Sequence, residues 1–268
     1  VAEVLASAGD GQGSGLAGDM LVAALTDLGV PFGEVAGGIA ALELPGVEVA
    51  LEAAERSAVA APRFLVREEA RQPMRDYRAV RGLLRGARSF PEGARRLALH
   101  AFQRLAQAEA AVHGMPEDDV HFHEVGAVDS IVDIAAVAVA LDYLGPSRIL
   151  VSPLPMGRGI VRGAAHGPLP NPAPATLGIL CAAKIPTFDA GCDLELVTPT
   201  GACLVAAAAS GCCAWPDMVP ASVGYGAGTR DLSDRANLCR VVLGEPWARG
   251  PGGGHDEQGE HNHSHSHS

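Results

Sequence analysis

The feature that most constrains the fold of this chain is an apolar segment, from Ile131 to Leu144, that carries a carboxylate near its start. Apolar side chains occupy nearly every position, so the segment predicts a helix that is apolar on all sides and lies inside a domain. Asp133 interrupts the apolar pattern in the first turn, and Asp142 lies near the end of the segment. Because a buried carboxylate costs free energy unless a cation, a metal ion or several donors pair with it, the segment also predicts a polar site beside the helix.

Imidazole and carboxylate groups are concentrated just before this helix. His121 and His123 alternate with apolar residues, so a short strand would present both imidazoles on one face. Asp129 lies four residues before Asp133 and shares its helical face. Together with Glu124, these side chains suit a divalent transition metal. The structural alternative is that Asp129 caps the helix and that the two histidines line the solvent face of an edge strand.

Several residues elsewhere are candidates for the same site. Asp19 begins a predicted helix, and its carboxylate either caps that helix or faces a metal or ligand from a glycine-rich loop. The helix predicted after Thr198 begins with free backbone N–H groups, which makes Thr200 and Gly201 candidates for phosphate binding. Arg230 is a candidate anion clamp in a glycine-rich loop, and His166 is a further imidazole.

Residues 120–134 resemble the signature of the LarC family, the nickel-insertion proteins that mature the nickel-pincer cofactor of lactate racemase. Further matches extend along most of the chain: Gly18-Asp19-Met20, residues 106–114, Ser152-Pro153-Leu154-Pro155, His166-Gly167, Leu169-Pro170-Asn171-Pro172, Glu195-Leu196-Val197-Thr198-Pro199-Thr200-Gly201 and Gly224-Tyr225-Gly226-Ala227-Gly228. This combination of motifs is specific, so the resemblance identifies the chain as a member of that family.

The resemblance implies a nickel chelatase, a metal-inserting lyase that depends on CTP. Its substrate would be pyridinium-3,5-bisthiocarboxylic acid mononucleotide, into which Ni(II) is inserted. On the motifs that match, we predict the following nickel ligands: His121, His123, Glu124, Asp133 and His166. The candidate catalytic residues are Glu124, Asp129 and Asp19, one of which would accept the proton lost from the ring carbon. Thr200, Gly201 and Arg230 would hold the nucleotide phosphate.

Two departures from the family pattern affect these expectations. Residues 10–17 are glycine-rich, where the family has an aromatic- and cysteine-containing motif. Members of the family also continue into a C-terminal part associated with CTP, whereas this sequence ends soon after Gly244. We therefore expect an N-terminal half, which is either a separate subunit or a truncated product. CTP and Mg or Mn would be bound by the C-terminal part, and a C-terminal LarC-like polypeptide is the expected partner.

The net charge and the cysteine content indicate which ligands and which cellular compartment suit this chain. The formal net charge is -11, which makes nucleic acid an unsuitable ligand and favours metal cations. The six cysteines include no Cys-x-x-Cys pair, so we expect reduced thiols in the cytoplasm. Neither a secretory signal nor an apolar segment long enough to cross a bilayer is evident. We also expect a homo-oligomer.

The order of predicted elements favours an α/β or α+β fold in which helices pack on a mixed sheet. We expect strands at residues 1–8, 47–55, 63–67, 148–151 and 238–243. Helices are expected from Asp19 to Leu28, within 74–88, from a capping box at Ser89-Phe90-Pro91-Glu92 to Gly114, and from Asp129 to Leu144. The segment 1–245 then forms one compact domain.

The remaining residues, 246–268, form a His-rich tail that we expect to be disordered. His261, His263 and His265 within it are candidate nickel ligands, since imidazoles on a flexible chain gather Ni(II). The tail leaves open a different function, that of a nickel-binding or storage module without catalysis. A third reading is a metal-dependent phosphoester hydrolase that uses the inner cluster.

Overall fold

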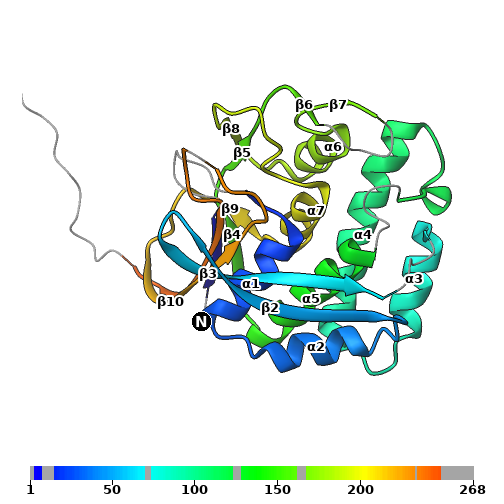
Figure 1. The fold of residues 1–268 in the computed structure, drawn as a ribbon, viewed down its shortest axis with the longest axis horizontal. Coiled ribbons are helices and arrows are strands. Elements are labelled where there is room, and N and C mark those ends of the chain that lie inside the picture. Colours follow the sequence, from blue (N-terminus) through cyan, green and yellow to red (C-terminus); the bar gives the residue numbers. More distant parts are fainter. Residues whose placement is uncertain are drawn as a thin grey trace, which may run out of the picture.

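A mixed five-stranded sheet forms the centre of the protein (Figure 1). The structure, a computed structural model, describes residues 3–7, 15–69, 74–122, 128–161, 167–232 and 234–248. The strands follow the spatial order β10 (Met218–Ala227), β11 (Leu238–Pro246), β1 (Glu3–Ser7), β4 (Arg148–Val151) and β9 (Gly211–Cys212). The β10–β11 and β11–β1 pairs are antiparallel, and the β1–β4 and β4–β9 pairs are parallel. The expected mixed sheet is thus confirmed.

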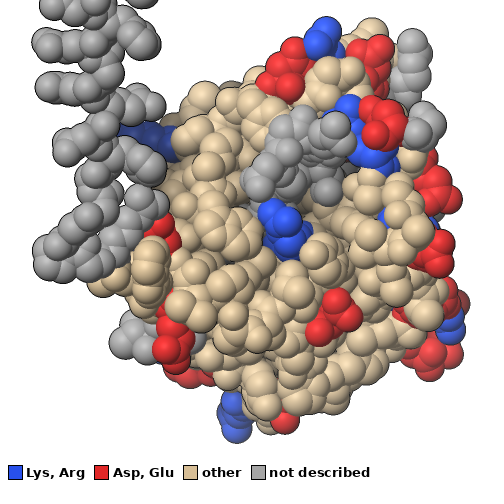
Figure 2. All heavy atoms as spheres, turned by 90° about the vertical axis from the view of Figure 1, so that its left-hand side faces the viewer, with Lys and Arg blue, Asp and Glu red and all other residues tan. Residues whose placement is uncertain are grey.

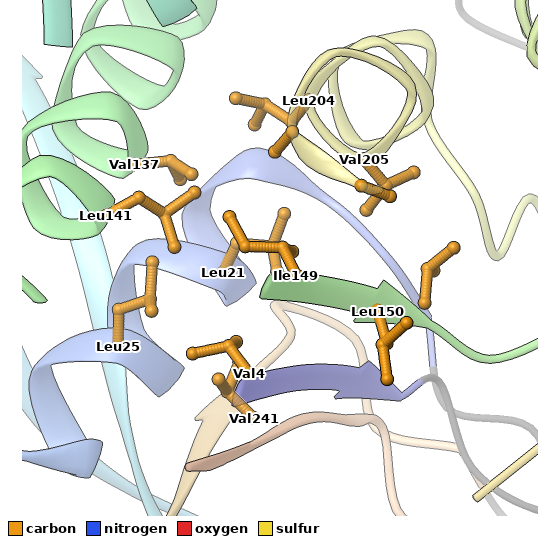
Figure 3. Close-up of a pocket in the computed structure, with 13 residues that line it drawn as sticks. Val4, Leu21, Leu25, Val137, Leu141, Ile149, Leu150, Leu204, Val205 and Val241 are labelled. Atoms are coloured by element: carbon orange, nitrogen blue, oxygen red, sulfur yellow. The ribbon is translucent and has the colours of Figure 1, made fainter. Parts of the chain in front are cut away.

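Three helices pack on one face of this sheet: α1 (Gly18–Leu28), α5 (Val128–Leu144) and α7 (Pro199–Ala208). The long helix α4 (Glu92–His113) packs against α5 and α7. As its apolar sequence predicts, α5 is buried along most of its length. Its side chains meet those of α1, α7 and the sheet around a small apolar pocket (Figure 3). Only apolar residues line it, so we assign this pocket to core packing.

The other elements surround this core: α2 (Phe32–Ala40), α3 (Tyr77–Gly86), η1 (Glu117–Asp119), α6 (Pro174–Ala183) and three two-stranded sheets. The longest of these sheets is the antiparallel hairpin of β2 (Val47–Arg56) and β3 (Val59–Glu68). The others pair β5 (Leu154–Met156) with β8 (Thr187–Asp189) and β6 (Ile160–Val161) with β7 (Leu169–Pro170).

Most predicted elements are found at the expected positions, but the capping box is wrong. Helix α4 begins at Glu92 with Pro91 as its N-cap, and no side chain caps it. Proline fixes φ near the helical value, so the chain enters the helix without the serine oxygen. At the other end of the helix, the Val112 side chain is 45% exposed. Gly114 ends the helix in the left-handed region, as expected.

The surface is uneven in its charge. Figure 2 shows a face on which uncharged residues predominate and most visible Asp and Glu side chains lie near the margins. Arginines on α3 pair with neighbouring acids instead of forming a free basic face: Arg81 lies 2.9 Å from Asp118, and Arg78 lies 3.4 Å from Asp119. These ion pairs partly neutralise the positive charge of α3.

The close packing of β10 on α1 determines where the following loop lies. A Cβ at Gly224 would approach the Ala24 carbonyl oxygen to 2.1 Å, and one at Gly226 would approach the Met20 carbonyl oxygen to 1.9 Å. Strand β10 therefore runs along α1 towards the N-terminus of that helix. The residues that follow β10 emerge beside Asp19.

Replacing Gly224 with Ala should destabilise the protein by at least about 2 kcal/mol, because two backbones would have to separate. Gly37→Ala is the matched control, since Gly37 lies in α2 with nothing within 4 Å of an added Cβ. The control should gain about 0.5–1 kcal/mol from helix propensity. Urea unfolding of both variants measures the difference, and equal stabilities would contradict the packing.

Candidate functional site

The N-terminus of α1 is held by a short segment that pairs with a distant part of the chain. The Leu16 N–H donates to the Leu196 carbonyl oxygen at 2.6 Å, and the Thr198 N–H donates to the Leu16 carbonyl oxygen at 3.1 Å. A Cβ at Gly201 would lie 2.3 Å from that same Leu16 oxygen. These contacts bring the starts of α1 and α7 together.

Asp133, on α5, packs directly against the first residue of α1. A Cβ at Gly18 would lie 2.6 Å from both the Cβ and Oδ2 of Asp133, so only glycine fits there. The Asp19 backbone N–H donates a hydrogen bond to the Asp133 carboxylate, an arrangement that the helix dipole favours. Asp133 as a residue is half-buried, but its Oδ1 is shielded from solvent and has no hydrogen-bond partner among the described residues. That oxygen is available for a proton or a cation.

Three aspartates near this point interact electrostatically. Burial raises the pKa of Asp133 well above its usual value, and the nearby carboxylates of Asp19 and Asp129 raise it further. Burial also raises the pKa of Asp19; Arg63 opposes this rise, whereas Asp129 adds to it. The pKa of Asp129 is raised by burial and by Glu68. A group of acids that favour their protonated forms would gain free energy by binding a cation.

Asp133→Asn should raise the free energy of unfolding at pH 7 and change it little near pH 3. The folded state favours the protonated carboxyl, so the stability this group contributes is present below its usual pKa of 3.8 and is lost as the pH rises through the raised value. Each pKa unit of difference corresponds to about 1.4 kcal/mol. Urea unfolding from pH 3 to pH 8 measures the effect.

The control for this experiment is Asp142→Asn, at the exposed far end of α5. Its stability profile should follow that of the wild type. If Asp133→Asn also followed the wild type at every pH, the raised pKa would be refuted.

A pocket lined by both polar and apolar residues opens beside Asp19. The polar residues that line it include Asp19, Glu195, Thr198, Arg230 and Asn237, and Gly15 and Gly228 contribute as well. Carboxylate, hydroxyl, amide and guanidinium groups thus face one space. Sequence analysis singled out Asp19 and Arg230, and the fold brings both to this pocket.

Thr200 and Gly201 have other contacts. The Thr200 hydroxyl is buried and donates to Ser130 Oγ at 3.3 Å, and the Gly201 N–H donates to Thr198 Oγ1 at 3.1 Å. Thr198 therefore caps the first turn of α7. It is Thr198, and not Thr200 or Gly201, that lines the pocket. Asn237 was not predicted as a pocket residue, because nothing in the sequence around it distinguishes it from an ordinary loop residue.

The predicted metal ligands are only partly within the described residues. His121 is exposed between the buried Val120 and Phe122, as the predicted alternation requires. His123, Glu124, His166 and the tail histidines His261, His263 and His265 lie outside the described residues. Within the described part of the chain, no three His, Cys, Asp or Glu side chains are grouped closely enough to hold a metal ion.

Cys239, a buried thiol that interacts electrostatically with Asp19, is not a ready metal ligand. Burial raises the pKa of Cys239 to about 12, and the Asp19 carboxylate contributes to the rise. The thiol is therefore protonated at neutral pH, whereas the thiolate is the form that binds metals.

The fold and the site define an α/β protein with a cluster of aspartates beside a polar pocket. Residues 9–267 match the family described as "Nickel insertion protein". Proteins from Geobacter sp. (strain M21) and Geotalea daltonii, both named "Putative nickel insertion protein", are 47% identical over 245 and 234 residues. These matches cover 91% and 87% of this chain and 62% and 59% of the relatives. No solved structure matches the chain.

This chain belongs to the nickel insertion protein family. It spans about three fifths of the length of the curated relatives it matches. Across the described ranges, no helix combines the length and the apolar character needed to cross a bilayer.

Proposed function

We propose that this chain binds Ni(II) as a substrate and takes part, in the cytoplasm, in its insertion into pyridinium-3,5-bisthiocarboxylic acid mononucleotide. The product would be the nickel-pincer cofactor of lactate racemase-type enzymes. Membership of the nickel insertion family supports the metal. The observation that carries the proposal is the shielded, unpartnered Oδ1 of Asp133 in its cluster of aspartates beside the polar pocket.

Asp133 would be the fixed part of the nickel site. Its burial disfavours a lone negative charge, so Ni(II) would take the place of the proton that the carboxyl otherwise holds. Glu124 precedes the start of α5 at Val128 by four residues, a distance of at most about 14 Å along an extended chain. Glu124 and His123 lie outside the described residues, and we propose both as ligands beside Asp129 because they precede α5 closely in the sequence. His121 and His166 complete the proposed set.

The reaction also needs a base, because a ring carbon loses a proton as the nickel–carbon bond forms. A carboxylate whose pKa is raised towards neutrality is suited to accept that proton. Asp19 has such a raised pKa and lines the pocket, and Asp129 interacts electrostatically with it. We propose one of these residues, or Glu124, as the base. Thiocarboxylate sulfurs of the substrate would supply the other bonds to nickel.

The pocket offers a place for the mononucleotide. Arg230 would bind its phosphate, because a guanidinium pairs well with phosphate oxygens. Thr198 lines the same space and takes the role first assigned to Thr200 and Gly201. We further propose that CTP, with Mg or Mn, binds to a separate C-terminal LarC-like polypeptide, and that the working chelatase is an oligomer of these chains.

Removing residues 249–268 should leave about one Ni(II) bound per chain, because the inner site does not need the tail. In that shortened chain, Asp133→Asn should weaken nickel binding at least tenfold, and Asp142→Asn should leave it unchanged. Equilibrium dialysis with Ni(II) at pH 7.5 measures both. Loss of all nickel with the tail would overturn the proposal in favour of a storage module.

A further inference from the structure

The loop after β10 is fixed by an arginine from a distant hairpin. Arg56 ends β2, and its side chain is only 11% exposed. Its Nη2 donates to the Gly228 carbonyl oxygen at 2.7 Å, and its Nε donates to the same oxygen at 3.1 Å. Nη2 also lies 3.4 Å from the Thr229 carbonyl oxygen, and Nε lies 3.1 Å from Asp231 Oδ1. One guanidinium thus contacts three residues of the loop.

Asn237 fixes the same loop from its other side. The Gly228 N–H donates to the Asn237 carbonyl oxygen at 2.9 Å, and Asn237 Nδ2 donates to the Arg230 carbonyl oxygen at 2.9 Å. A Cβ at Gly228 would lie 2.3 Å from Asn237 Nδ2, so the loop approaches this amide as closely as glycine allows. The backbone from 228 to 230 is therefore held on both sides.

The side chain that these contacts leave available is that of Arg230. It lies in the middle of the fixed loop and lines the pocket with Asp19 and Thr198. Its guanidinium forms no ion pair or hydrogen bond with another residue in the described ranges. The loop thus presents the Arg230 guanidinium to the pocket on a backbone that hydrogen bonds hold in place. This arrangement lowers the entropy cost of binding an anion.

We infer that Arg56 is a positioning residue, which holds the 228–231 backbone so that Arg230 meets the phosphate of a mononucleotide in the pocket. This inference rests on the proposed function. A planar guanidinium can donate to two carbonyl oxygens and pair with Asp231 at once, whereas a lysine ammonium has no such fork. The tip of the β2–β3 hairpin therefore belongs to the binding site, although Arg56 precedes Gly228 by 172 residues.

A double-mutant cycle tests this role. Nicotinic acid mononucleotide and its riboside, which lacks the phosphate, serve as probes in calorimetric titrations. Arg56→Lys should weaken binding of the mononucleotide about fivefold or more and leave the riboside unchanged. Arg230→Ala should do the same, and the double variant should bind no more weakly than Arg230→Ala alone. Additive losses, or equal losses for both probes, would overturn the inference.

Arg67→Lys is the matched control on the same hairpin, because Arg67 pairs with Glu52 at the surface and, among the described residues, no ion pair or hydrogen bond joins it to the loop. It should change neither titration. Amide hydrogen exchange at Arg230 and Asp231 provides a readout without ligand. It should accelerate in Arg56→Lys and not in Arg67→Lys, and unchanged exchange would overturn the positioning role.

The two measurements separate this inference from the proposed function. If the wild type binds neither probe although exchange accelerates as expected, the pocket is not the mononucleotide site and the phosphate role of Arg230 is overturned. If the mononucleotide binds and the cycle is additive, the site stands and Arg56 has no part in positioning Arg230. If the mononucleotide binds as expected but no nickel is inserted, only the proposed reaction is contradicted.

Discussion

The proposed nickel site depends on one contact, the packing of the Asp133 carboxylate against the N-terminus of α1. Gly18 has no side chain, and this lets the carboxyl approach the first turn closely enough to accept the Asp19 N–H. A helix N-terminus is one of few places inside an apolar core where a carboxylate is tolerated. Oδ1 of Asp133 has no hydrogen-bond partner among the described residues, so the fold favours binding of a proton or a metal ion by this carboxylate.

The pocket beside this contact is assembled from parts of the chain that are far apart in sequence. The bridge between Leu16 and Val197 joins the starts of α1 and α7. Glycines of β10 allow that strand to lie along α1, so the loop carrying Arg230 ends beside Asp19. Backbone contacts that require glycine thus determine the position of each polar group.

The sequence predicted the scaffold better than the site. An acid early in an otherwise apolar helix pointed to Asp133, because burial and charge can both be predicted from a local sequence pattern. The strand predicted at 47–55 also follows from local alternation, and it is found as β2 (Val47–Arg56). Asn237 and Arg56 could not have been found in this way, because their roles lie in hydrogen bonds to distant backbone groups. Thr200 and Gly201 were predicted to bind phosphate because the helix was expected to begin with free N–H groups. In the structure the Gly201 N–H donates to Thr198 Oγ1, which a local sequence pattern does not reveal.

The most direct test of the central claim is carbon-13 NMR of the aspartate carboxyl resonances during a titration with substoichiometric Ni(II), which is paramagnetic and broadens nearby signals. The account predicts that the resonances of Asp133, Asp19 and Asp129 broaden first and that the resonance of Asp142 stays sharp. Sharp resonances from all three aspartates, with broadening confined to the histidines of residues 249–268, would contradict it.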